Sequence, residues 1–420
     1  MGTAIAPSDT PLSPPPSTSS AAEASRPDAP ARSVALDVLR GAAALMVLVW
    51  HAYPVSASGD FAPGWGLAFA DTGLGQGGVT LFFVLSGFLI GGPFLEARLG
   101  LRRAPNLRAY ALRRAARIVP AYWLALVGMT GVLGYFSLQA PTGKQLILHA
   151  LFVQNWVPGE ANGFFPPGWT LGVEALFYVV LPLGVLGLLR TTRPDANGLG
   201  VAIGAVWLMS SVCGFIAWGW FTERSIGEWG TIGPNSLPAT LFLFCPGLLI
   251  AVARAAPKDN RVAPALTWLR QHAFVSVVLM VGAFTLACAC ELPGNNAVLE
   301  LRYQALMVAA GLLVNLALGW RTAWRGGLGV FAALGRWSYG IYLWHYPVAR
   351  AVSRTGLTPP ATDGILLRWA VFGLAVALLT IPLAAASWYV VERPLIARAQ
   401  AWRPGGLRGR AQPALSLGDG

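Results

Sequence analysis

Charged residues are scarce in this chain. Asp, Glu, Lys and Arg make up 11% of its 420 residues, while hydrophobic residues make up 55%. A soluble globular protein carries about 25% charged residues. This shortage argues against an ordinary soluble domain and favours a protein embedded in lipid.

Cysteine is also scarce, with four residues in the chain. Each lies inside an apolar run, and none has the paired spacing of a metal site or of a disulfide framework. No other cluster has metal-ligand spacing, and no Gly-rich phosphate loop precedes a strand. The sequence therefore predicts no metal, and it predicts four small buried hydrophobic residues at Cys213, Cys245, Cys288 and Cys290.

The two ends of the chain differ from its middle. Residues 1–34 are rich in Ala, Pro and Ser, so we expect a disordered tail there. This tail lacks a short basic start followed at once by an apolar stretch, so the first apolar run is expected to stay in the mature protein. Residues 397–420 are expected to form a second, flexible tail. Residues 35–396 then make a single membrane domain.

Long apolar runs are what the sequence has in abundance. A transmembrane helix needs about 20 mostly apolar residues, and these runs are continuously apolar, which favours helices over a barrel. The sequence predicts an all-α polytopic membrane protein with about ten helices. We expect them at residues 36–56, 73–95, 112–137, 168–189, 199–221, 237–255, 272–291, 298–320, 329–352 and 365–391. Residues 143–157 are too short to cross and are expected at the membrane interface.

The formal net charge of +12 tests this arrangement. If the amino terminus is cytoplasmic and the helices alternate, most of the 30 Lys and Arg fall on the cytoplasmic side, which is the positive-inside pattern. Both termini are therefore predicted to be cytoplasmic, and the basic charge needs no nucleic-acid partner. The basic residues on the outer side are Lys144, Arg224, Arg302, Arg350, Arg354 and Arg368.

The first apolar run, "LDVLRGAAALMVLVWHAYP" (36–54), carries an arginine and a histidine. Eleven helical steps of about 100° bring Arg40 and His51 to within about 20° of the same face, about 16 Å apart along the axis. A cation at the interface and a polar helix contact are the simplest explanations. Ionisable groups at membrane depth, however, usually mark a functional cavity.

Further motifs follow in order along the chain. Together they resemble the acyltransferase-3 family of bacterial integral-membrane O-acyltransferases, over about residues 36–395. The resemblance rests on the Arg40–His51 spacing and on "FFVLSGFLI" (82–90), "RRAARIVPAYW" (113–123), "PPGWTLGVEALFYVVLPL" (166–183) and "GRWSYGIYLWHYPV" (335–348). Thr170 stands where the family usually has Ser, and Ala175 where many members have a second acidic residue.

The resemblance implies an acyl-CoA donor from the cytoplasm and an acceptor hydroxyl. His51 is then a plausible general base, because its ordinary pKa of about 6.5 suits proton transfer; a transient acyl-histidine is the alternative route. Arg40 is expected to hold the donor or shape the field around it. Arg114 and Arg117 share a helical face, and with Arg113 they are expected to bind coenzyme A phosphates. Positive-inside topology accounts for Arg98, Arg102, Arg103 and Arg108.

Glu174 enters from the outer side at a depth comparable with that of His51, so the two side chains are expected to be able to meet. It would orient His51, bind acceptor hydroxyls or pair with a buried arginine. Trp169, Tyr342 and His345 are candidate substrate-binding residues, although a place in the aromatic belt also explains Trp169, and a helix contact also explains His345. Ser86 and Gly87 are expected to allow close helix packing, and His149 and His272 to be incidental.

The sequence predicts an inner-membrane O-acyltransferase that moves a short acyl group, acetyl by default, onto a carbohydrate or a sugar-bearing small molecule. The alternative is a secondary transporter or exporter whose buried Arg, His and Glu form a proton-coupled site. Transporters often show two related halves, and no such internal repeat is visible here.

Overall fold

The structure is a computed structural model. It describes residues 2, 34–56, 69–161, 163–187, 195–217, 233, 235–258, 260–291, 296–320, 328–357 and 364–402. The predicted disorder of residues 1–34 falls almost wholly outside these ranges. So does most of the predicted tail at 397–420, although the last helix extends to Ala401.

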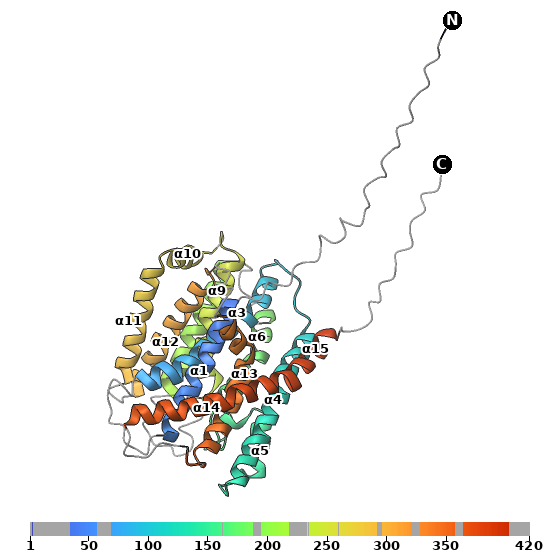
Figure 1. Cartoon of the computed structure of the whole chain (residues 1–420). Helices are drawn as coiled ribbons and strands as arrows, with labels where there is room; N and C mark the ends of the chain where they lie inside the picture. Colours follow the sequence, from blue (N-terminus) through green and yellow to red (C-terminus); the bar gives the residue numbers. More distant parts are fainter. Residues whose placement is uncertain are drawn as a thin grey trace. The chain divides into compact units, whose positions relative to one another are not determined.

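All regular structure in the described ranges is helical, which confirms the all-α prediction (Figure 1). In chain order the elements are α1 (Val34–Ser56), η1 (Phe69–Gln76), α3 (Gly77–Arg98), α4 (Leu107–Tyr135), α5 (Gly143–Ala150), η2 (Gln154–Trp156), α6 (Gly168–Leu186), α7 (Ala196–Ile216), α8 (Leu237–Thr240), η6 (Leu241–Phe244), α9 (Cys245–Ala255), α10 (Ala263–Gln271), α11 (Ala273–Glu291), α12 (Asn296–Ala317), α13 (Leu328–Val352), α14 (Ile365–Ser387), η7 (Trp388–Glu392) and α15 (Arg393–Ala401).

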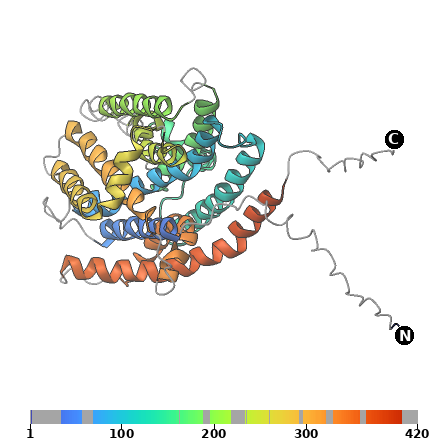
Figure 2. The ribbon, with the colours of Figure 1, turned by 90° about the horizontal axis from the view of Figure 1, so that it is seen from above.

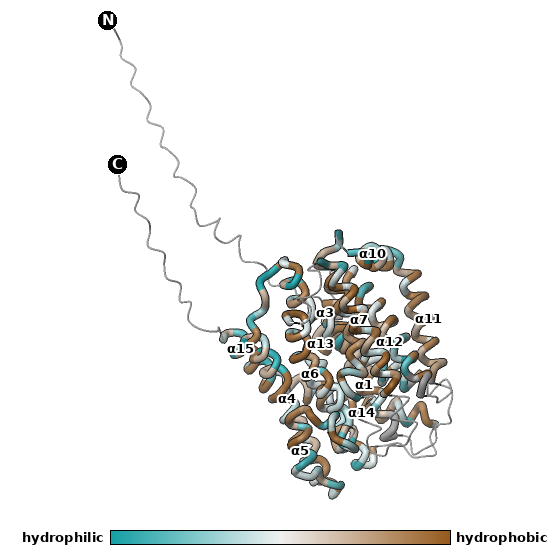
Figure 3. Tube along the Cα trace, turned by 180° about the vertical axis from the view of Figure 1, so that it is seen from behind, coloured by the Kyte–Doolittle hydropathy of each residue, from teal (hydrophilic) through white to brown (hydrophobic). Residues whose placement is uncertain are grey.

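Eight helical segments among the described residues are long and apolar enough to cross a membrane. Figure 3 shows hydrophobic residues running along these helices, and hydrophilic ones gathered on parts such as α10 and α15. Two helices that the sequence predicts as spans, α12 and α13, are formed but fall outside this set because they carry polar residues such as Glu300, Arg302 and His345. The total of ten spans and the cytoplasmic termini stay predictions.

Helices α1 and α13 pack backbone to backbone. A Cβ on Gly335 would lie 1.9 Å from the carbonyl oxygen of Asp37, and one on Gly41 would lie 2.9 Å from that of Phe331. Only glycine allows so close an approach. The contact fixes α1 against α13, and α14 covers the two helices along one side of the bundle (Figure 2).

A second glycine pair joins α3 to α9. A Cβ on Gly247 would lie 2.0 Å from the carbonyl oxygen of Val84, and one on Gly87 would lie 2.2 Å from that of Phe244. This confirms the packing role predicted for Gly87. Ser86, in contrast, is turned away from that contact and hydrogen-bonds Glu174.

Helix α4 carries the arginines of the candidate site, and its start is fixed locally. The side chain of Asn106 accepts a hydrogen bond from the backbone N–H of Ala109 at 2.9 Å, which caps the helix. Arg114 and Arg117 follow in the next turns and face the same side, as their spacing predicts.

The remaining predictions about single residues have mixed outcomes. Cys245, Cys288 and Cys290 are buried as predicted, Cys213 is half-buried, and none of the four forms a disulfide. His272 is exposed and stacks on Trp268. His149 is fully buried, and Gly163 and Gly168 pack against its ring; that it is incidental to function stays a prediction.

Candidate active site

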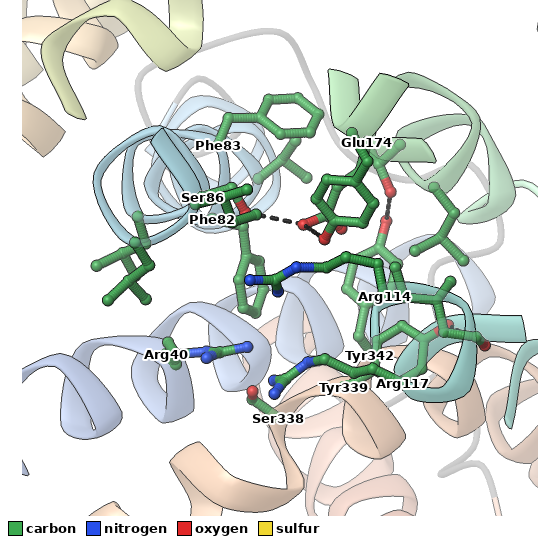
Figure 4. A pocket seen from close by; sticks show the side chains of 18 residues that line it. Arg40, Phe82, Phe83, Ser86, Arg114, Arg117, Glu174, Ser338, Tyr339 and Tyr342 are labelled. Carbon is green, nitrogen blue, oxygen red and sulfur yellow. Dashed lines mark hydrogen bonds between the residues drawn. The ribbon is translucent and has the colours of Figure 1, made fainter. Parts of the chain in front are cut away.

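A cavity of about 220 Å³ lies between α1, α3, α4, α6 and α13. Its charged lining consists of three guanidinium groups and one carboxylate, and hydroxyl groups complete its polar surface (Figure 4). The charged residues are Arg40, Arg114, Arg117 and Glu174, and the hydroxyl-bearing ones are Ser86, Thr170, Tyr178, Ser338, Tyr339 and Tyr342. The cavity therefore gathers polar groups from helices that are far apart in the sequence.

Glu174 is held by two hydroxyl groups. Ser86 donates to its Oε1 at 2.8 Å, and Tyr178, one turn further along α6, donates to the same oxygen at 2.5 Å. Its Oε2 accepts no hydrogen bond from the described residues. The carboxylate is therefore fixed in orientation and keeps one oxygen free for a further donor.

The three guanidinium groups converge from two helices. Figure 4 shows Arg40 of α1 and Arg114 and Arg117 of α4 directed into the same space. The guanidinium of Arg114 also lies 5.5 Å from the ring centre of Tyr178, a cation–π distance. Three positive groups against one carboxylate leave an excess of positive charge, which suits an anionic ligand with phosphate groups.

A second cavity of about 330 Å³ adjoins the first, since the two share Ile90, Arg114 and Arg117 in their linings. It adds Arg113, which was predicted to bind coenzyme A phosphates with these arginines, and Arg102, whose charge was attributed to positive-inside topology. Arg102 also pairs with Glu96 at 3.0 Å. The last helix, α15, completes the wall with Ile396 and Gln400. Four arginines thus line this outer cavity.

His51 and His345 form a separate pair. Their ring centroids lie 4.8 Å apart at an angle of 56°, and neither residue lines the two cavities. His51 Nδ1 lies 2.9 Å from the carbonyl oxygen of Val47. Because a carbonyl only accepts, Nδ1 carries the proton, and the lone pair of neutral His51 is on Nε2. His345 is fully buried, and its Nε2 has no hydrogen-bond partner among the described residues.

Tyr342 lies between the histidine pair and the cavity. Its ring lines the cavity and lies 5.7 Å from the ring of His345. Its hydroxyl donates to the carbonyl oxygen of Pro167 at 3.0 Å and lies 2.5 Å from Thr170 Oγ1. Thr170 therefore supplies a hydroxyl where the family motif usually has serine. These hydrogen bonds hold Tyr342 between the histidine pair and the cavity.

Two of the candidate site residues, His51 and Trp169, lie outside the main cavity. Glu174 was expected to be able to reach His51, but the ring neighbours of His51 are His345 and Tyr346. The cause is the tertiary structure: α13 lies alongside α1, and its residues His345 and Tyr346 pack against the ring of His51. Trp169 is outside the main cavity and packs edge-on against Phe83, with ring centres 6.3 Å apart.

Sequence reasoning missed the groups that hold Glu174. Tyr178 is four residues after Glu174, so helical spacing alone would have indicated it. Ser86 gave no such signal, because it comes from a different helix, 88 residues away in the chain.

Comparison with known proteins adds an independent observation. A family model described as an acyltransferase domain matches residues 33–388 of this chain. No solved structure matches it.

Several characterised proteins are similar in sequence. The exopolysaccharide production protein ExoZ of Rhizobium meliloti is 30% identical over 353 residues, which are 80% of this chain and 95% of that protein. The acyltransferase MdmB of Streptomyces mycarofaciens is 27% identical over 76% of this chain and 79% of its own length. The peptidoglycan O-acetyltransferase OatA of Listeria monocytogenes is 26% identical over 74% of this chain, a match that spans 49% of that protein.

Proposed function

The chain belongs to the acyltransferase family whose domain model covers residues 33–388, and from this premise we propose that it transfers a short acyl group from acyl-CoA to a hydroxyl of a carbohydrate. It is an acyltransferase by family. The observation that carries the proposal is the cavity lined by Arg40, Arg114, Arg117 and a single carboxylate, which adjoins a second cavity lined also by Arg102 and Arg113.

The donor is proposed to bind through its phosphates. Arginine forms bidentate, charge-assisted hydrogen bonds with phosphate, and the outer cavity offers Arg102, Arg113, Arg114 and Arg117. The pantetheine arm would then extend into the inner cavity, whose apolar side chains include Leu89 and Ile90. With both termini cytoplasmic, the outer cavity would face the cytoplasm and receive acyl-CoA from there. The protein would lie in the inner membrane.

His51 is proposed as the general base. Its Nε2 lone pair takes the proton of the acceptor hydroxyl as the hydroxyl oxygen attacks the thioester carbonyl carbon. The carbon–sulfur bond then breaks, and the thiolate leaves with that proton as free coenzyme A. Arg40, which lines the cavity on the other side of Tyr342, would hold the donor or shape the field around it. In the alternative route, His51 Nε2 itself attacks the thioester and forms an acyl-histidine that the hydroxyl then cleaves.

The acceptor is proposed to be a carbohydrate. Two of the similar proteins are named for exopolysaccharide production and for peptidoglycan O-acetylation, and a third is a Streptomyces acyltransferase, which keeps a sugar-bearing small molecule as a second candidate. Glu174 has a free Oε2, which suits a hydrogen bond from an acceptor hydroxyl. Acetyl is the default acyl group.

The test is acyl transfer by protein purified and placed in lipid nanodiscs, with labelled acetyl-CoA and a panel of soluble and lipid-linked sugars. His51→Ala is expected to lower kcat by about 10²–10⁴-fold, the range for the loss of a general base. His272→Ala is the matched control, because His272 is an exposed histidine away from both cavities.

Three outcomes are distinguishable. Loss of transfer in His51→Ala, with the control active, supports the proposal. Transfer that is indifferent to His51 keeps the acyltransferase but rejects His51 as its base. Absence of coenzyme A binding across several acyl chains rejects the donor.

A further inference from the structure

A cavity of about 360 Å³ lies where α9, α10 and α12 meet. It shares no lining residue with the two cavities of the candidate active site. Arg254 at the end of α9 and Arg270 of α10 both line it, and so does Asn315 of α12. None of the described residues in its lining is acidic. The cavity is therefore cationic, and the acyl-transfer proposal does not use it.

The two arginines have few partners of their own. Arg270 Nη2 donates to Thr267 Oγ1 at 3.1 Å, and its Cδ lies 3.6 Å from where a Cβ on Gly319 would be, so its side chain lies against the segment just after α12. Arg254 makes no ion pair with the part of the chain that the structure describes. The two positive charges are close enough to repel each other. An anion between them would remove this repulsion.

Asn315 supplies the second observation. Its side chain is only 1% exposed, and its Nδ2 donates to the carbonyl oxygen of Leu266 at 2.9 Å. Its Oδ1 is buried and has no hydrogen-bond partner among the described residues. A buried acceptor without a donor is unfavourable. The two cationic donors therefore line one cavity together with Asn315, whose Oδ1 is buried and unsatisfied in the structure.

We propose that this cavity binds the headgroup of an anionic phospholipid of the phosphatidylglycerol type. The phosphodiester lies between the guanidinium groups of Arg254 and Arg270, and a glycerol hydroxyl donates to Oδ1 of Asn315. A bare phosphate ion matches the arginines as well, and its P–OH group can donate to Oδ1, so the choice of a lipid rests on the surroundings of the cavity. A headgroup with two hydroxyls satisfies all three groups.

The surroundings favour a lipid over a soluble ligand. Apolar side chains complete the wall of the cavity: Ile250, Leu266 and Leu318. On α10 and its cap, Trp268 is 48% exposed and Val262 is 38% exposed, and a half-exposed tryptophan is typical of a helix at the membrane interface. Basic pockets between membrane helices are suited to anionic headgroups. Bound there, the lipid joins α10 to α9 and α12.

The experiment measures thermal unfolding of the full-length protein in a neutral detergent. It compares dioctanoyl phosphatidylglycerol, dioctanoyl phosphatidylcholine and inorganic phosphate as additives. Phosphatidylglycerol is expected to raise the unfolding temperature of the wild type. In the double variant Arg254→Gln with Arg270→Gln, the concentration of phosphatidylglycerol that gives half of this rise is expected to be at least tenfold higher. The matched control is Arg103→Gln with Arg398→Gln, two exposed arginines that line none of the three cavities.

Asn315→Ala tests the headgroup itself. Phosphatidylmethanol has the same charge as phosphatidylglycerol but no headgroup hydroxyl. The wild type is expected to prefer phosphatidylglycerol, and the variant is expected to bind both equally. Because the two lipids are compared within one variant, a general loss of stability does not affect the result.

Several results overturn the proposal. One is an equal response of the wild type to phosphatidylglycerol and phosphatidylcholine, and another is an unchanged response in the double variant. If inorganic phosphate is as effective as phosphatidylglycerol, the cavity is a soluble-anion site. None of these outcomes depends on acyl transfer, so the result is independent of the proposed function.

Discussion

The imidazole rings of His51 and His345 lie 4.8 Å apart, on two helices that pack backbone to backbone through Gly335 and Gly41. Side chains in contact seldom act independently. We therefore expect His51→Ala and His345→Ala to be non-additive, with a coupling of about 0.5–3 kcal/mol in the free energy of activation. A double-mutant cycle on kcat/KM measures it, and additive effects would argue against a working pair.

The orientation of Glu174 depends on two hydroxyl groups. Tyr178→Phe and Ser86→Ala each remove a hydrogen bond to a carboxylate, an interaction worth about 1.5–3 kcal/mol. Each is expected to raise the KM for the acceptor about tenfold or more and to leave the KM for acyl-CoA within about twofold. Tyr135→Phe is the control, since Tyr135 is exposed at the end of α4. An effect on the donor alone would reject a role of Glu174 in acceptor binding.

The arginines of α4 are expected to recognise the phosphates of the donor. Arg114→Gln and Arg117→Gln should each raise the KM for acetyl-CoA about tenfold or more, because a charged hydrogen bond contributes about 1.5–3 kcal/mol. The same variants should treat acetyl-pantetheine, which has no phosphate, as the wild type does. Arg103→Gln serves as the charge-matched control. An equal loss with both donors would mean that these arginines support the cavity without binding phosphate.

The contact of α1 with α13 depends on the absence of a side chain at Gly335. A methyl group there would lie 1.9 Å from a backbone oxygen, and forced overpacking costs about 1–3 kcal/mol or more. Gly335→Ala is expected to lower the unfolding temperature and the rate of transfer together. Gly329→Ala, on the same helix with no heavy atom within 4 Å, should be neutral or stabilise by up to about 1 kcal/mol. Equal stability of the two variants would contradict the close packing.

Burial lowers the pKa of His149, although the backbone carbonyl of Gln145 and the charge of Glu160 act in the opposite direction. The unfolded chain therefore takes up a proton on this residue before the folded protein does. Stability should fall as the pH drops through about 6.5, the ordinary pKa of histidine. His149→Asn should reduce this loss between pH 7.5 and 5.5, as measured by thermal unfolding. His272→Asn, at an exposed histidine, should keep the wild-type pH dependence, and identical pH profiles for wild type and His149→Asn would contradict the prediction.

Some features of the site were predictable because they are local. Helical spacing places Arg40 and His51 on one side of α1, and in the structure both residues face α13 or the cavity beside it. The pairing of Arg114 with Arg117 follows from the same geometry. The motif residues Glu174 and Tyr342 also line the cavity. The family could be identified from these motifs, and the matching acyltransferase model confirms it.

Other features depended on distant contacts. Ser86 reaches Glu174 across 88 residues of chain, and Tyr342 reaches Thr170 across 172. Arg102 lines the outer cavity together with α15, the last helix in the sequence, which packs against α4. His51 was expected to be able to meet Glu174, and α13 instead brings His345 to it.

The sequence by itself determined that the chain forms long apolar helices, since a backbone in lipid must satisfy its hydrogen bonds within each segment and a run of about 20 apolar residues does so as a helix. Only the tertiary structure decided which polar side chains meet. Those meetings depend on where helices cross, and the crossings are set by close approach at Gly335, Gly41, Gly87 and Gly247. In the resulting arrangement neither His51 nor His345 lines the arginine-lined cavity, and Tyr342 lines the cavity and contacts the ring of His345.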